Sequence, residues 1–111
     1  MTYKRIEDQK AHNNLCIFAG CINGFNIHYA KLVELFGQPR IVDGDEWSCQ
    51  WVLKDSNNET LLIWYYPYVA QLLGIQQPKS IEQVQFWTVI SHTETAFENL
   101  EEFLWNDLIN Q

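Results

Sequence analysis

Apolar side chains recur at helical spacing in residues 27–36, which predicts the first helix of the chain. Asn26 precedes this pattern and is a suitable N-cap, because its side-chain oxygen can accept a backbone amide of the first turn. Gly37 predicts the end of the helix, since glycine enters the left-handed conformation without a steric clash, and Pro39 prevents the helix from resuming. The opposite side of this helix carries three polar residues, His28, Lys31 and Glu34.

A second helical pattern covers residues 92–108. Ser91 and Glu94 have the spacing of a capping box, in which each side chain accepts the backbone amide of the other residue. The helix is therefore expected to be amphipathic and to pack on the rest of the protein through one face. That apolar face comprises Ala96, Phe97, Leu100, Phe103, Leu104 and Leu108.

Between the two helical patterns, alternating or continuous apolar residues predict three strands, at 47–54, 60–66 and 83–90. The second of these is apolar on both faces, so we expect it in the middle of the sheet with cover on both sides. The connection to the third strand is irregular, with a short helical turn predicted at 68–73.

These elements predict a two-layer α+β domain with an antiparallel sheet of three or four strands and two amphipathic helices, in the order (β)αβββα. The optional first strand is the apolar segment 15–22, which is either a strand or an extended arm laid on the sheet. Asn23-Gly24 after it predicts a turn. We expect a single domain at 15–111, preceded by a polar and loosely ordered lead-in at 1–14.

Composition narrows the class of protein. The 111 residues allow one hydrophobic core, and 47% hydrophobic residues exclude a disordered tail even though the net charge is −7. No apolar run approaches the ~18 residues that a membrane helix needs. No secretory leader opens the sequence, and its three cysteines are an odd number. We therefore expect a protein of the reducing cytosol and not a disulfide scaffold.

The negative charge is concentrated in residues 80–111, which hold six carboxylates and no Lys or Arg. At about 100° per residue, four of these acids and one indole share a sector of the closing helix opposite its apolar face. This sector is either a solvated face that keeps the protein soluble or a docking surface for a basic partner, with the indole as anchor. Its members are Glu94, Glu98, Glu101, Glu102 and Trp105, and a second contact is expected at Asp43, Asp45 and Glu46.

A second candidate surface is aromatic. On the predicted strands, Tyr65 lies on the face opposite Trp64, and Trp87 lies opposite Phe86. If both helices cover the other face, Tyr65 and Trp87 form an exposed binding surface for a small molecule or nucleotide, or for a second copy of the chain. Alternatively, the N-terminal arm or residues 67–82 cover this face and make it part of the core.

No pattern predicts catalysis, a metal site or a cofactor. The acidic residues in 43–46 lack the spacing of a calcium loop, and the three histidines have no recognisable serine or cysteine partner. Cys16, Cys21 and His28 do not match a zinc motif, so the cysteines are interpreted as core residues. We therefore expect a protein that binds another macromolecule and is not an enzyme.

Several short signatures follow one another along residues 20–104. They are the segment 29–39 (YAKLVELFGQP), the loop Asp43-Gly44-Asp45, the strand 51–53 (WVL), the strand 59–66 (ETLLIWYY) and the segment 87–92 (WTVISH). In this order they resemble a group of small phage and mobile-element proteins, which have a helix ending in Phe-Gly-x-Pro, an Asp-Gly loop, a Trp strand, an Ile-Tyr strand and a late Trp strand before the final helix. The chain departs from that group at Glu46, where a lysine usually follows the loop, and at Trp64. The group has no shared activity from which a catalytic residue could be carried over.

The resemblance implies an origin in a phage or mobile element, whose small acidic proteins often bind and block host machinery such as CRISPR effectors. We expect a stoichiometric counter-defence inhibitor in the host cytosol that occupies a basic surface of a host protein or nucleoprotein complex. Phosphates would be repelled by its charge, so no direct nucleic-acid contact is expected, and no membrane contact. An immunity protein that neutralises a cognate nuclease toxin is an alternative with the same physics, and a binding module or homodimer that uses the aromatic face is another.

Overall fold

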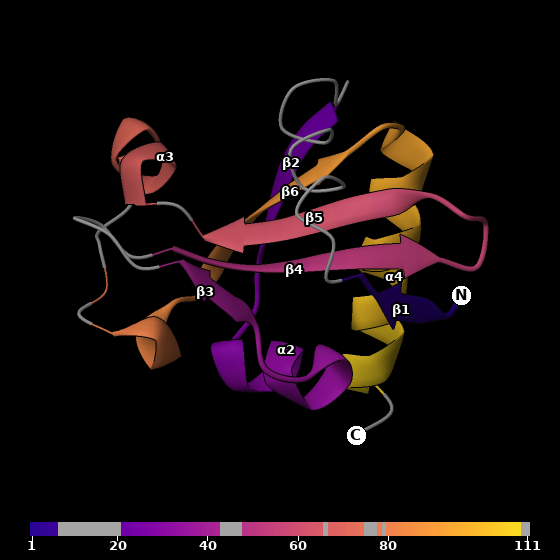
Figure 1. Ribbon diagram of the computed structural model, residues 1–111, viewed down its shortest axis with the longest axis horizontal. Coiled ribbons are helices and arrows are strands. Elements are labelled where there is room, and N and C mark those ends of the chain that lie inside the picture. The colour runs from indigo at the N-terminus through magenta and orange to yellow at the C-terminus, as the bar shows by residue number, and fades with distance from the viewer. Residues whose placement is uncertain (7–20, 43–47, 66, 75–77, 79, 110–111) are drawn as a thin grey trace.

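Strands β4 (Ser48–Asp55) and β5 (Thr60–Tyr65) form a hairpin in the middle of the computed structural model (Figure 1). The turn between them forms because Oδ1 of Asp55 accepts the backbone amides of Asn57 and Glu59, each at 2.9 Å. The structure describes residues 1–6, 21–42, 48–65, 67–74, 78 and 80–109.

Six strands of the described residues form the sheet, and each pairing among them is antiparallel. The strand order is β1-β4-β5-β6-β2, and β3 also pairs with β4. β2 therefore lies at one edge of the sheet, while β1 and β3 share the other edge. The bounds of these further strands are β1 (Tyr3–Arg5), β2 (Cys21–Asn26), β3 (Arg40–Val42) and β6 (Phe86–Ser91).

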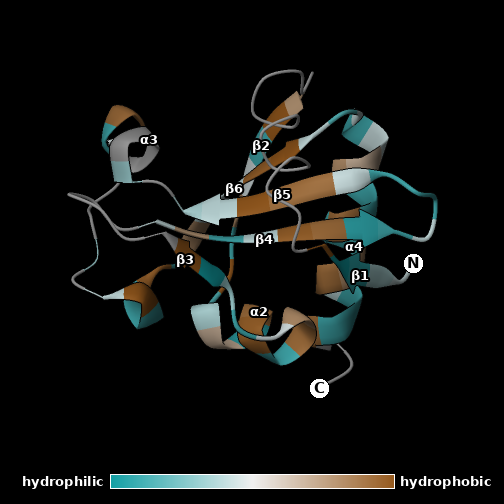
Figure 2. Cartoon of the chain, in the orientation of Figure 1, coloured by the Kyte–Doolittle hydropathy of each residue, from teal (hydrophilic) through white to brown (hydrophobic). Residues whose placement is uncertain are grey.

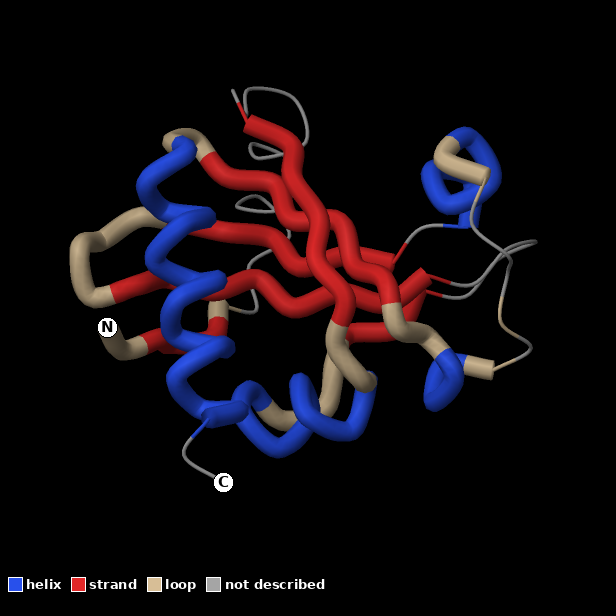
Figure 3. The backbone as a smooth tube through the Cα atoms, turned by 180° about the vertical axis from the view of Figure 1, so that it is seen from behind, coloured by secondary structure: helices blue, strands red, loops and turns tan. Residues whose placement is uncertain are grey.

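The two longer helices lie on the same face of the sheet, which is the face turned to the viewer in Figure 3. α4 (Glu94–Ile109) packs against β6, β2 and β5, and α2 (Tyr29–Phe36) lies near the C-terminal end of α4. The connection between β5 and β6 contains the short helix α3 (Pro67–Leu72) and the 3-10 turn η1 (Ile81–Gln83). The helical turn predicted in this connection is thus present.

The predicted α+β class is confirmed, but the prediction of three or four strands and the predicted order (β)αβββα are wrong, because two strands precede α2 and a third follows it before β4. β1 lies within the predicted lead-in, and β1 and β3 have three residues each, which is too short for alternation to show in the sequence. β2 contains Asn23-Gly24, which predicts a turn but pairs here with Val89 and Thr88. A Cβ at position 24 would lie 2.5 Å from the Phe86 ring, so any larger residue there requires this ring to shift. Of the predicted strand 15–22, residues 15–20 lie outside the described residues.

Of the two predicted ends of α2, only the C-terminal end at Gly37 is confirmed. Gly37 has a φ of 83° and its amide donates to the Val33 carbonyl at 2.8 Å, as expected for a residue that ends a helix. Asn26 is not the N-cap, because it is still part of β2 and pairs with Phe86. His28 occupies the N-cap position and makes no capping bond with its side chain.

The predicted capping box of α4 is also wrong. Ser91 is the last residue of β6 and is fully buried, and its hydroxyl donates to the Thr93 carbonyl at 2.8 Å. Thr93 caps the helix instead, because its Oγ1 accepts the Ala96 amide at 3.2 Å. The strand extends further than its apolar pattern indicates, so the start of the helix moves by two residues.

The main core lies between the sheet and the two helices, and two tryptophans are at its centre. Trp51 and Trp87 are fully buried, with ring centroids 5.2 Å apart in an edge-to-face arrangement. Each indole N–H finds a backbone acceptor, the Gly37 carbonyl at 2.9 Å for Trp51 and the Ile27 carbonyl at 3.0 Å for Trp87. These bonds connect the sheet to both ends of α2.

A smaller core lies on the opposite face of the sheet. Val52, Leu62 and Ile90 are buried there, and Trp64 and Ile6 pack against them. Because β5 contributes to both cores, its middle is hydrophobic throughout, whereas the turn after β4 is hydrophilic (Figure 2). The prediction that this strand is central and covered on both faces is confirmed.

The exposed aromatic surface expected at Tyr65 and Trp87 does not form. Both residues are buried in the main core, on the face that the helices cover. The cross-strand register explains the difference, since Tyr65 pairs with Cys49 and therefore shares the apolar face of β4. A small molecule, nucleotide or second copy cannot use these two side chains without opening the core.

Burial of Cys49 predicts a loss of stability at alkaline pH. Burial raises the pKa of this thiol from 9.0 to about 12, so the folded state holds a proton that the unfolded state releases above pH 9. The free energy of unfolding should therefore decrease as the pH rises from about 9 towards 12. Cys49→Ala should flatten this decrease in urea unfolding measured at several pH values. Equal slopes for the variant and the wild type would contradict the assignment.

Candidate functional site

The outer side of α4 carries the predicted acidic face. Glu94, Glu98, Glu101 and Glu102 are exposed, and Trp105 among them is 63% exposed. An indole left in water forgoes a large favourable burial energy that contact with a ligand would recover. The predicted exposure of Trp105 is confirmed, and its role in binding stays a prediction.

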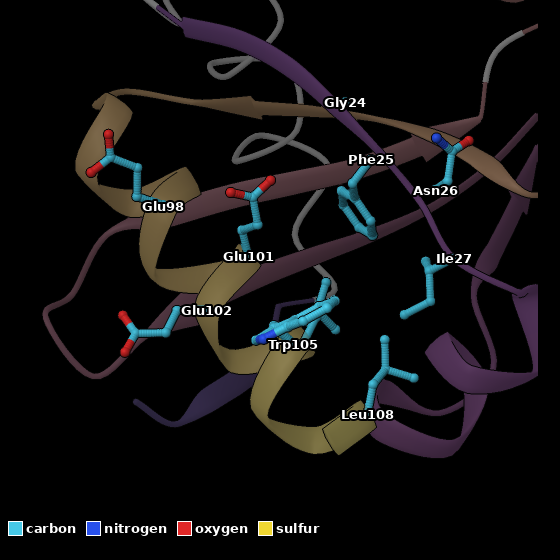
Figure 4. A pocket seen from close by; sticks show the side chains of 10 residues that line it. Gly24, Phe25, Asn26, Ile27, Glu98, Glu101, Glu102, Trp105 and Leu108 are labelled. Carbon is cyan, nitrogen blue, oxygen red and sulfur yellow. The ribbon is translucent and has the colours of Figure 1, made fainter. Parts of the chain in front are cut away.

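A groove of about 620 Å³ runs between α4 and β2, beside Trp105 (Figure 4). Phe25 projects into it from β2, and Ile27 faces Leu108 at the end nearest α2. Glu101 lies beside Phe25, whereas Glu98 and Glu102 point to the other side of the helix. The groove is thus apolar around Trp105 and acidic along its α4 rim. Residues 24–27 form one wall, and the α4 wall comprises Glu98, Glu101, Glu102, Leu104, Trp105 and Leu108.

One acid of α4 is neutralised within the fold. Asp107 forms an ion pair with Lys31 of α2, whose Nζ also lies 3.4 Å from the Glu34 carboxylate. The hydrogen bond with Asp107 raises the pKa of Lys31, which keeps this mostly buried amine charged. Lys31 was expected on the solvated side of its helix, but the approach of α4 covers it. Asp107 is therefore a structural residue and adds little to the acidic face.

Glu94 also has a structural partner. Its Oε2 accepts the Asn23 side-chain amide at 3.2 Å, which connects the start of α4 to β2. Burial and a hydrogen bond with Glu94 both raise the pKa of the Cys21 thiol. Within the described part of the chain, no basic side chain forms an ion pair with the three remaining acids, Glu98, Glu101 and Glu102.

The structure brings together only part of the predicted site. Asp43, Asp45 and Glu46 lie outside the described residues, so the second acidic contact stays a prediction. Tyr65 and Trp87 belong to the core, as shown above. The acidic face of α4 is the part that the structure places at the surface.

Sequence reasoning missed the apolar half of the groove. Leu108 was assigned to the buried face of the helix but is 43% exposed. At about 100° per residue Leu108 lies only about 60° from Trp105, so a helical projection contains the signal. Phe25 and Ile27 could not be found in this way, because their positions depend on β2, which the sequence pattern does not show.

The site offers features that a ligand could contact. No three His, Cys, Asp or Glu side chains gather into a metal-binding group in the described segments. Nor is any helix there long and apolar enough to cross a membrane. The features that the site offers a ligand are an exposed indole, an apolar groove and three carboxylates that form no ion pair with a described basic residue.

A scan against protein-family models and searches of curated proteins and of solved structures found no match to this chain.

Proposed function

We propose that this protein binds a basic surface of a partner protein through the acidic face of α4, with Trp105 as its aromatic anchor. The observation that carries the proposal is the 63% exposure of Trp105 beside carboxylates without a basic neighbour in the described residues. Tryptophan is strongly enriched among the residues that dominate binding energy at protein interfaces. The apolar groove next to Trp105 provides area that a partner could desolvate.

The spacing of the acids supports this interpretation over a purely solvated face. Glu98 repels both Glu94 and Glu102 at i, i+4 spacing, which costs the isolated helix a few tenths of a kcal/mol per pair. A lysine at any of these positions would relieve the repulsion and keep the helix soluble. The chain instead retains a negative field that accelerates encounter with a positive patch.

The biological role that we propose is stoichiometric inhibition of host machinery by a phage or mobile-element protein, with a counter-defence target. Inhibition by occupancy requires only a surface that competes with the natural ligand of a basic site. No catalytic residue is part of this proposal. A cognate nuclease toxin would present a basic surface of the same kind, so the immunity-protein alternative would use the same residues. The resemblance described above favours the phage role.

Reversal of two charges on α4 should weaken capture of the partner. We expect Glu98→Lys/Glu101→Lys to weaken binding about tenfold or more and to reduce its salt dependence, since the attraction becomes repulsion. The thermal midpoint should hardly change, because both side chains are exposed. The measurement is quantitative capture from bacterial lysate with the wild type and the variant, followed by titration of the purified captured protein.

A matched control distinguishes the effect of losing the acidic face from the effect of changing the net charge. Glu59→Lys/Glu82→Lys changes the net charge by the same amount at positions outside α4. This control should bind like the wild type, whereas Trp105→Ala should lose most of the affinity. If the Glu98/Glu101 variant captures its partner as well as the wild type does, the acidic face is not the binding site.

A further inference from the structure

Within the described residues, the edge of the sheet at β2 has backbone groups beside the groove that no other strand pairs with. The Ile27 amide donates to the Gln85 carbonyl at 2.8 Å, which fixes the hydrogen-bonding phase between β2 and β6. In an antiparallel pair, successive residues direct their N–H and C=O groups alternately towards and away from the partner strand. The N–H and C=O groups of Ile22, Gly24 and Asn26 therefore point away from β6. No described strand pairs with this outer side of β2.

The two edges of the sheet differ in length and charge. β1 and β3 at the far edge have three residues each and carry basic side chains, Lys4 and Arg5 in β1 and Arg40 in β3. Short edge strands and charged residues are the usual protection against the addition of a further strand. β2 has six residues with no charge and no proline, and its Ile22 is 74% exposed. β2 is thus the edge at which strand addition is unopposed.

The groove lies where the side chains of an added strand would point. Alternate residues of such a strand face the helix-bearing side of the sheet, which α4 lines with Glu101 near Phe25 and with Trp105 and Leu108 further along (Figure 4). Six paired residues span about 20 Å at ~3.3 Å per residue. The Glu101 carboxylate on this side of α4 complements lysine or arginine, and the Trp105 indole complements an apolar side chain.

We propose that β2 accepts an extended segment of the partner as an additional strand, with a Lys or Arg side chain against Glu101 and an apolar residue against Trp105 and Leu108. This inference rests on the proposed function and specifies how the same site holds a basic partner. Backbone hydrogen bonds provide affinity in this mode, and the alternate side chains provide specificity. A second copy of the chain fits less well, because two bodies with a net charge of −7 repel each other.

The test uses the full chain and a defined probe, a short capped peptide of alternating lysine and valine. Residue-resolved hydrogen exchange and heteronuclear NMR report on the outward amides of Ile22, Gly24 and Asn26. We expect saturable binding, with slower exchange at these amides and shifted signals of the Trp105 indole. The matched control is a lysine–alanine peptide of equal charge, which favours a helix and should bind much more weakly.

A backbone substitution tests the strand contact directly. Asn26→Pro removes one outward N–H and leaves the bonds that face β6 in place, so affinity for the lysine–valine peptide should fall about tenfold. Asn26→Thr keeps the N–H and should bind like the wild type. Should Asn26→Pro disturb the fold, the same peptide N-methylated at alternate amides gives an independent test with the wild-type chain, and it should not bind.

The outcomes separate this inference from the proposed function. Equal binding of both peptides with unchanged amide exchange overturns strand addition, and so does full binding of the N-methylated peptide. If Glu98→Lys/Glu101→Lys still weakens that binding, the acidic face remains the site. Slow exchange at the outward amides without peptide, together with dimer mass at increasing concentration, would identify a second copy as the occupant and overturn the proposal.

Discussion

Trp87→Ala should lower the free energy of unfolding by about 3–5 kcal/mol, which is the cost of removing a large buried aromatic side chain. Trp87 is fully buried and contacts Trp51, Tyr65 and Tyr29 with ring centroids 5.2 to 6.4 Å apart. Its loss also leaves the Ile27 carbonyl without the indole donor. Domains of this size have a free energy of unfolding of about 5–15 kcal/mol in total, so this variant should lose a large part of its stability.

Urea unfolding followed by circular dichroism measures this effect, with Trp87→Phe as the control. Phenylalanine keeps one aromatic ring and removes the remainder of the indole with its N–H, so we expect a smaller loss of about 1–3 kcal/mol. The comparison also tests the aromatic-surface hypothesis. If Trp87→Ala folded with wild-type stability, the side chain would be at the surface and the placement of the main core would be wrong.

Leu62→Ala should cost about 2–4 kcal/mol, which is the second-largest effect expected. Leu62 is fully buried on the sheet face opposite the helices, together with Val52 and Ile90. If this face were open to solvent, truncation of the side chain would change stability by less than about 0.5 kcal/mol. The substitution therefore measures how well the second core is covered.

Ile22→Ala is the matched control for Leu62→Ala. Ile22 pairs with Ile90 and lies in the same cross-strand row, but it is 74% exposed at the edge of the sheet. We expect a change within about 0.5 kcal/mol in the same urea experiment. If the two variants lost similar amounts of stability, burial on this face would not decrease from the central strand β5 to the edge strand β2.

The sequence by itself determined the elements whose local signals are strong. Long apolar periodicity gave α4 and the β4–β5–β6 segment, and Gly37 ended α2 at the predicted residue. The exposure of Trp105 also followed from sequence, because a helix of 3.6 residues per turn assigns every side chain to a direction once its buried face is known. The fold class, the central position of β5 and the acidic face of α4 therefore all follow from the local pattern of apolar and polar residues.

The tertiary structure decided the features that depend on pairing between distant segments. β1 and β3 form because β4 offers hydrogen bonds along its outer edge, and Asn23-Gly24 extends instead of turning because β6 lies beside it. The same register directs Trp87 into the core and Phe25 towards Trp105. A strand of three residues is too short to show an alternating pattern in the sequence. The face of the sheet to which its side chains point is set by the strand with which it pairs. For this reason the groove could be recognised only once β2 and α4 were placed together.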